Sequence, residues 1–112
     1  MRVAIPLSGG RLSPHFGHCE EFALIDVDPE TQEISRSERL AAPPHEPGRL
    51  PRWLAEQKAT VILAGGMGQR AQMLFAQHGI EVCVGIGDGD PEALARQYAS
   101  GELQAGENLC DH

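Results

Sequence analysis

The sequence predicts a single α/β domain in which three helices pack against a five-stranded mixed sheet. The chain has 112 residues, which suits one domain with a buried core. Its first part contains three short segments with strand character, and its second part alternates helical periodicity with short apolar runs. Three strands followed by helix–strand–helix–strand–helix imply an antiparallel start, right-handed crossovers and helices on the faces of the sheet.

Three strands are expected in the first forty residues. The apolar run at residues 3–7 predicts a buried strand, which opens into the flexible segment Ser8-Gly9-Gly10. Residues 22–27 predict the second strand, and the turn sequence at residues 28–31 has proline in a suitable position. The third strand, residues 33–40, alternates with polar residues and is typical of an exposed hairpin arm.

Helices enter after a proline-rich connection at residues 42–48, which blocks regular structure. The first helix is expected over residues 50–57, and it is followed by an apolar strand at residues 60–64. The next helix carries apolar residues at positions 71, 74 and 75 and stops at Gly79.

The last strand and helix complete the domain. Residues 81–84 predict the fifth strand. Asp90 is a suitable N-cap, Pro91 fits the first helical position, and Gly101 ends the final helix. The domain is expected to span residues 1–112, with residues 102–112 as a flexible tail.

Composition excludes several classes of function. The net charge of −7 and the scattered lysines and arginines argue against a nucleic-acid partner. No window approaches the roughly 18 apolar residues of a membrane helix, and the N-terminus lacks the apolar region of a signal peptide. We therefore expect a cytoplasmic protein. The three cysteines, Cys19, Cys83 and Cys110, are odd in number and widely spaced, which disfavours a disulfide framework.

The loop sequence Ser13-Pro14-His15-Phe16-Gly17-His18-Cys19 places two imidazoles and a thiol within five residues. Histidine and cysteine are good ligands for borderline and soft transition metals. Proline and glycine mark the segment as a shaped loop, and such loops often carry binding chemistry. The alternative is that both histidines are solvated and Cys19 packs as a small apolar residue.

A glycine-rich turn, Gly65-Gly66-Met67-Gly68, follows the fourth expected strand and opens a helix. Its backbone N–H groups and the helix dipole could hold an anion, or the glycines could serve close packing alone. Met67 could be a thioether ligand or could cover the edge of the core. The local match to a dinucleotide motif is discounted because it does not lie on the first strand.

The chain ends in Cys110-Asp111-His112, which resembles a metal-binding tail, although terminal residues are usually mobile. Catalytic arrangements are poor by comparison. Ser8 has no nucleophile-elbow context, and no convincing set of acidic residues for a two-metal nuclease is found. The sequence therefore favours a protein that is not an enzyme.

Taken together, several motifs resemble the dinitrogenase iron–molybdenum cofactor biosynthesis family, which includes NifX-like proteins and the C-terminal domain of NifB-like proteins. The motifs are Val3-Ala4-Ile5-Pro6, the loop at residues 13–17, Ile62-Leu63-Ala64 with the glycine-rich turn, His78-Gly79-Ile80, and Gly101-Glu102-Leu103. The resemblance implies a ribonuclease H-like three-layer fold. It also implies carriage of an iron–sulfur or molybdenum-containing metal–sulfur cluster, with metallocofactor assembly proteins as partners.

The resemblance assigns binding to His15, Phe16 and Gly17, with Gly66 and Gly68 opposite them, and Met67 is added as a cofactor-binding candidate because it lies at the start of the helix. Candidate metal ligands are His15, His18, Cys19, Cys110 and His112. Three cysteines cannot form a four-cysteine cluster site. A cluster would therefore need histidine, ligands shared across a homodimer, or capture as an anion. The alternative functions are a protein-interaction or regulatory module with incidental metal binding, and a small hydrolase, which fold alone cannot support.

Overall fold

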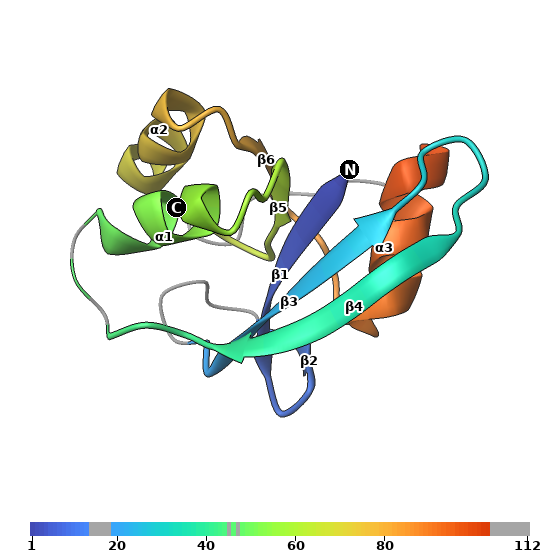
Figure 1. Ribbon diagram of the computed structural model, residues 1–112. Coiled ribbons are helices and arrows are strands. Elements are labelled where there is room, and N and C mark those ends of the chain that lie inside the picture. Colours follow the sequence, from blue (N-terminus) through green and yellow to red (C-terminus); the bar gives the residue numbers. More distant parts are fainter. Residues whose placement is uncertain (14–18, 45, 47, 104–112) are drawn as a thin grey trace.

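The computed structural model describes residues 1–13, 19–44, 46 and 48–103. Within this part of the chain, one mixed sheet is covered by helices on both faces (Figure 1). The strands are β1 (Arg2–Ser8), β2 (Arg11–Leu12), β3 (Glu21–Val27), β4 (Ile34–Ala41), β5 (Val61–Leu63) and β6 (Glu81–Cys83). The helices are α1 (Arg49–Glu56), α2 (Gln69–Gln77) and α3 (Pro91–Ser100).

The strand order is β4-β3-β1-β5-β6, and β2 pairs with the end of β1. β1, β3 and β4 form an antiparallel meander, whereas β5 and β6 run parallel to β1. The predicted mixed sheet with three helices is therefore confirmed. No helix in the described residues has the length and apolar character needed to cross a membrane.

The prediction of five strands was wrong, because the described part of the chain has six. The additional strand is β2, which follows the segment Ser8-Gly9-Gly10 that the sequence predicts as flexible and for which no strand is predicted. Gly9 and Gly10 both have positive φ angles, 63° and 82°, as the central residues of a type I′ hairpin require. This turn pairs Leu7 with Leu12 and Ser8 with Arg11. The Gly-Gly dipeptide was the sequence signal for it.

β1 lies at the centre of the domain and is buried on both faces. Its odd-numbered residues Val3, Ile5 and Leu7 belong to one apolar cluster, to which α3 contributes Leu94 and Ala95. Burial on both faces explains why β1 is a continuous apolar run and shows no alternation.

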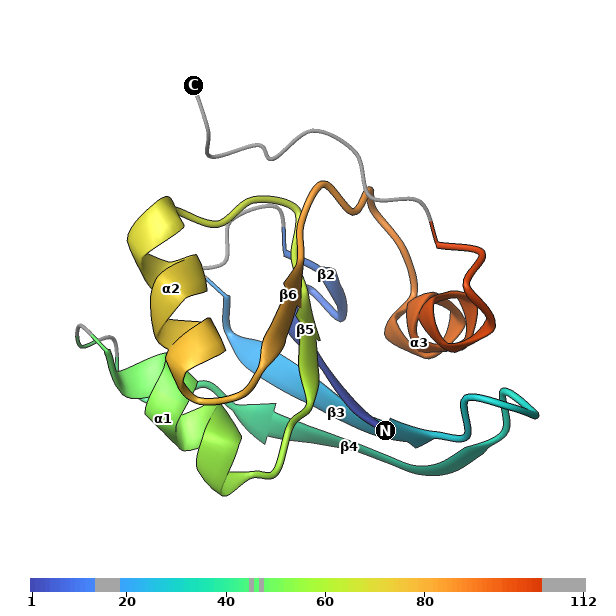
Figure 2. The same cartoon turned by 90° about the horizontal axis from the view of Figure 1, so that it is seen from above.

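The other face of the sheet carries α1 and α2. Here Ala4 of β1 joins a second apolar cluster that includes Phe22 and Leu24 of β3, Leu54 of α1 and Phe75 of α2. Viewed from above, α1 and α2 lie on one side of the sheet and α3 on the other (Figure 2). The domain thus has three layers.

One polar contact ties the sheet to the end of α1. The Arg2 guanidinium donates to both carboxylate oxygens of Asp26, at 2.9 and 3.0 Å, and to the backbone oxygen of Gln57 at 2.7 Å. This hydrogen bonding lowers the pKa of Asp26. A single side chain therefore joins β1, β3 and the C-terminal end of α1.

Candidate functional site

The parallel strands β1, β5 and β6 all end at the same edge of the sheet, which we call the carboxyl edge. Their register places Ala4 beside Ile62, and Leu63 beside Cys83. From this edge, α2 follows β5 onto one face, and α3 follows β6 onto the opposite face (Figure 2). In open α/β sheets, ligands bind outside the carboxyl ends of the strands where successive connections leave for opposite faces. The carboxyl edge is therefore the candidate site.

Both ends of the predicted histidine-containing loop are fixed at this edge. Ser13 donates its backbone N–H to the oxygen of Pro6 at 2.8 Å, and Glu20 donates its own to the oxygen of Leu7 at 2.8 Å. Ser13 is buried, with 2% of its surface exposed. Two neighbouring carbonyls of β1 thus hold the residues that flank the loop.

The glycine-rich turn lies at the same edge, directly after β5. Residues 64–67 are buried, and the turn is joined to the segment after β6 by a hydrogen bond from the Gly85 N–H to the Gly65 oxygen at 3.0 Å. Met67 is 1% exposed and belongs to the core cluster beneath α1 and α2. Its side chain therefore covers the core, which was one of the two alternatives for this residue.

The N-terminus of α2 has neither a capping side chain nor an acidic residue in its first turn. Its N-cap residue is Gly68, which is exposed, and Arg70 adds a positive charge in that turn. The first N–H groups of a helix have no partner within the helix and form the positive end of its dipole. This end of α2 can therefore accept an external anion.

The N-terminus of α3, at the same edge, is built differently. Asp90 caps the helix by accepting the Ala93 N–H at 3.2 Å, and Glu92 adds a second carboxylate in the first turn. The Asp90 carboxylate thus accepts the Ala93 N–H, and the two negative charges offset the positive end of the α3 dipole. Among the described residues, a side chain caps the N-terminus of α3, whereas the N-cap residue of α2 makes no side-chain cap hydrogen bond and its first turn has no acidic residue.

Cys19 is the one predicted metal ligand within the described residues. It is half-buried and packs against the cluster that contains Ala64 and Met67. Burial raises the pKa of its thiol to about 11, an effect that a hydrogen bond from its own backbone N–H partly offsets. The free thiol is therefore protonated at neutral pH. A metal that binds it would have to displace the proton.

Cys83 lies in β6 and packs against the opposite core cluster, the one completed by α3. Burial, together with the negative charge of Glu81, raises the pKa of this thiol as well. Cys19 and Cys83 are thus comparable half-buried thiols on opposite faces of the sheet.

The remaining predicted ligands are not placed by the structure. His15, Phe16, Gly17 and His18 lie outside the described residues, as do Cys110 and His112. Within the described ranges, no group of three or more histidine, cysteine or acidic side chains is arranged to hold a metal ion.

One contact at the carboxyl edge had no signal in the sequence. The Arg11 side chain pairs with Asp88 at 3.0 Å, and the Leu12 N–H donates to the Gly89 oxygen at 3.3 Å. These contacts join β2 to the segment between β6 and α3. The ion pair is exposed, so its contribution to stability is small, and its effect is to bring the two segments together.

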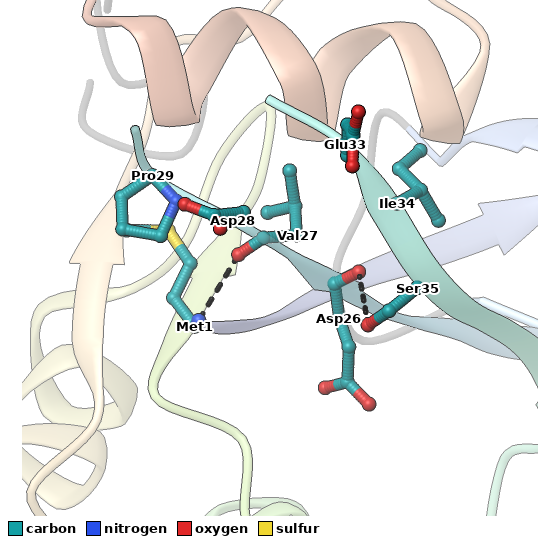
Figure 3. A pocket seen from close by; sticks show the side chains of 8 residues that line it. All are labelled: Met1, Asp26, Val27, Asp28, Pro29, Glu33, Ile34 and Ser35. Atoms are coloured by element: carbon teal, nitrogen blue, oxygen red, sulfur yellow. Dashed lines mark hydrogen bonds between the residues drawn. The ribbon is translucent and has the colours of Figure 1, made fainter. Parts of the chain in front are cut away.

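A pocket of about 510 Å³ lies at the other end of the strands, away from the carboxyl edge and beside the turn between β3 and β4 (Figure 3). Of its three carboxylates, Asp26 pairs with Arg2, Asp28 accepts the Glu30 N–H at 2.8 Å, and Glu33 is exposed at the surface. The N-terminal ammonium of Met1 donates to the Val27 oxygen at 3.1 Å. This pocket is therefore part of a structural turn and is distinct from the carboxyl edge.

Comparison with protein families assigns the chain to a family. The model of the family described as "Dinitrogenase iron-molybdenum cofactor" matches residues 1–101. The chain belongs to this family. Membership confirms the resemblance seen in the sequence motifs, and it associates the chain with proteins of the iron–molybdenum cofactor.

The chain is also similar to individual proteins. MJ0580 of Methanocaldococcus jannaschii is 33% identical over 87 residues, which are 73% of this chain and 72% of MJ0580. The crystal structure of PH0822 matches with a TM-score of 0.87 and 29% identity over 100% of both chains. The apo form of the orange protein from Desulfovibrio gigas matches with a TM-score of 0.72, at 22% identity over 96% of this chain and 93% of that one. At that identity, the last match shows a shared fold.

Proposed function

We propose that this chain is a non-catalytic cytoplasmic carrier that binds an anionic metal–sulfur cluster, or a precursor of one, at the carboxyl edge. The cluster is of the iron–sulfur or molybdenum-containing kind, and the carrier exchanges it with metallocofactor assembly proteins. The ribonuclease H-like class is part of the same proposal for the fold. Family membership supports the kind of cargo, since the family is named for the iron–molybdenum cofactor.

The observation that carries the proposal is the juxtaposition at the carboxyl edge. Because β1 and β5 are parallel neighbours, the fixed ends of the 14–18 segment and the uncapped start of α2 lie at the same edge. The 14–18 segment and Cys19 supply histidine and cysteine ligands by their sequence. The start of α2 supplies N–H donors and a positive electrostatic potential. Metal–sulfur clusters are anions that bind metal-ligating side chains and accept hydrogen bonds at sulfur.

In this proposal, His15 and Cys19 are the principal ligands, and Phe16 and Gly17 shape the segment between them. Gly66, Met67 and Gly68 form the opposite wall by their position in the turn, with N–H groups at the start of α2 directed at the cluster. His18, Cys110 and His112 are additional candidate ligands.

Anaerobic reconstitution tests this function. The full-length chain is incubated with iron and sulfide, or with tetrathiomolybdate, and is then desalted and analysed for metal and for visible charge-transfer absorption. We expect a coloured, metal-containing product whose yield falls in the His15→Ala and Cys19→Ser variants. Cys83→Ser is the matched control, because Cys83 is also a half-buried thiol but lies on the other face of the sheet. A colourless, metal-free product with every cargo would exclude the proposal.

The alternative is a protein-interaction module in which metal binding is incidental. Capture of a specific assembly partner by the metal-free chain, unchanged in the His15→Ala variant, would favour it. Capture that requires the loaded chain would favour the carrier. The two outcomes separate binding of the cargo from binding of a protein.

A further inference from the structure

β4 forms one lateral edge of the sheet and is its longest strand, with 8 residues. It pairs with β3 on one side, and in the described part of the chain no strand pairs with its other side (Figure 1). Ser35, Arg36, Ser37 and Arg39 are all exposed. An uncovered edge of this length is a template for pairing with another strand.

The hydrogen bond at the end of the ladder shows which backbone groups of β4 point outwards. Ala42 donates its N–H to the oxygen of Glu20 at 3.0 Å, so this pair is hydrogen-bonded. Along an antiparallel ladder, hydrogen-bonded and non-hydrogen-bonded pairs alternate, and the register is continuous from Ala41 back to Arg36. Ser37 and Arg39 therefore direct their N–H and C=O groups away from β3.

The charges of β4 are complementary to those of a second, antiparallel copy of the same strand. If two copies pair about a two-fold axis at Ser37, Arg36 of each copy lies opposite Glu38 of the other. Within one chain these two side chains already pair at 3.0 Å, so four charges of alternating sign would adjoin. Opposite charges across a strand pair are favourable, and like charges are unfavourable.

Neighbouring two-fold registers lack this complementarity. A register centred on Arg36 or Arg39 places two arginines opposite each other, and one centred on Glu38 places two carboxylates opposite each other. Only the axis at Ser37 combines outward-directed backbone groups at the centre with opposite charges on either side. The sequence of β4 therefore selects one register.

We propose that two copies of this chain associate through β4, antiparallel and centred on Ser37, to form one continuous sheet. The interface is self-complementary, so it closes after two copies. The other lateral edge strand of the sheet is β6, which has only 3 residues. Such a short edge strand gives little support to further growth of the sheet.

The proposed dimer keeps the two carboxyl edges apart. β4 runs in the same direction as β1, because both are antiparallel to β3. The two-fold axis reverses this direction in the second copy, so the carboxyl edges face opposite ways. Each copy then binds its cargo independently, and the dimer goes beyond the proposed function without depending on it.

A charge swap tests the interface. Sedimentation velocity of the full-length chain, from micromolar to millimolar concentration, should show a reversible monomer–dimer equilibrium. Arg36→Glu should weaken the dimer by roughly tenfold or more, because the two-fold axis repeats each like-charge contact. The double variant Arg36→Glu/Glu38→Arg should restore it. A wild-type chain that stays monomeric at millimolar concentration, or a double variant as weak as the single one, would overturn the proposal.

Cross-linking tests the register. In the proposed dimer, the two Ser37 residues are a directly opposed pair with Cα atoms about 5.5 Å apart, which a disulfide can span. Ser37→Cys should therefore give an intermolecular disulfide under mild oxidant. Ser35→Cys is the matched control, since its two copies would lie four residues apart along the strand, roughly 13 Å, and should cross-link no more than wild type. Equal cross-linking of both variants would exclude this register.

Discussion

Replacing Gly68 with aspartate tests whether the N-terminus of α2 is open for an anion. Gly68 has φ −63° and ψ 154°, and a Cβ placed there meets nothing within 4 Å, so aspartate fits without strain. Its carboxylate should cap α2 as Asp90 caps α3. Over glycine, the cap adds a few tenths of a kcal/mol, and the charge adds about 0.3–1 kcal/mol at the helix dipole. The expected gain is about 1 kcal/mol, or a rise of about 4 °C in Tm for a domain of this size.

The same change should weaken cargo binding, because the new carboxylate occupies the donors and repels an anion. Thermal unfolding of the metal-free chain measures the first effect, and anaerobic titration with tetrathiomolybdate measures the second. Gly68→Asn is the matched control, since asparagine caps as well as aspartate without the charge. We expect both variants to be stabilised, and Gly68→Asp to bind about tenfold more weakly than Gly68→Asn, because both side chains occupy the N–H donors but only aspartate also repels the anion. Equal binding by the two variants would refute the role assigned to α2.

Two further predictions concern the stability of the fold. Asp90→Ala removes the cap of α3 and should lower the free energy of unfolding by about 1 kcal/mol, measured by urea titration; unchanged stability would contradict this role. Asp26→Asn removes a carboxylate whose pKa is lowered by the hydrogen bonds from Arg2. The ionised Asp26 therefore stabilises the fold fully at pH values above its ordinary pKa near 3.8. This stabilisation is lost as the pH falls through the lowered pKa of the folded chain. The stability difference between wild type and Asp26→Asn, measured by urea titration at a series of pH values, should therefore shrink with acidification. A difference that stays constant with pH would contradict this role of the ion pair.

Much of the fold follows from local patterns in the sequence. The apolar run of β1 and the caps at Asp90 and Gly101 were read correctly, because burial and helix ends depend on residues close together in the chain. β2 was missed because Gly9-Gly10 was interpreted as flexibility, although a two-residue turn with positive φ angles fits it equally well. A strand of two residues is too short to show any periodicity.

The candidate site was only partly predictable. The sequence places the glycine-rich turn at the start of a helix, but it does not show which residue of the turn is the N-cap, and the structure assigns that position to Gly68, which has no side chain to cap the helix. The pairing of Arg11 with Asp88 joins positions 77 residues apart, and no local pattern encodes such a contact. Cys19 was expected as a ligand or as a small core residue, and its half-buried thiol leaves both roles open to experiment.

The two hydrogen bonds that fix Ser13 and Glu20 to Pro6 and Leu7 involve backbone atoms alone. Substitutions among residues 14–18 leave these donors and acceptors in place, so the intervening segment can change its side chains while its endpoints keep their attachment to β1. A domain built in this way can exchange one set of ligands for another without a new core. Variants in which the 14–18 sequence is replaced as a cassette should therefore retain the thermal stability of the parent chain while differing in the metals they take up.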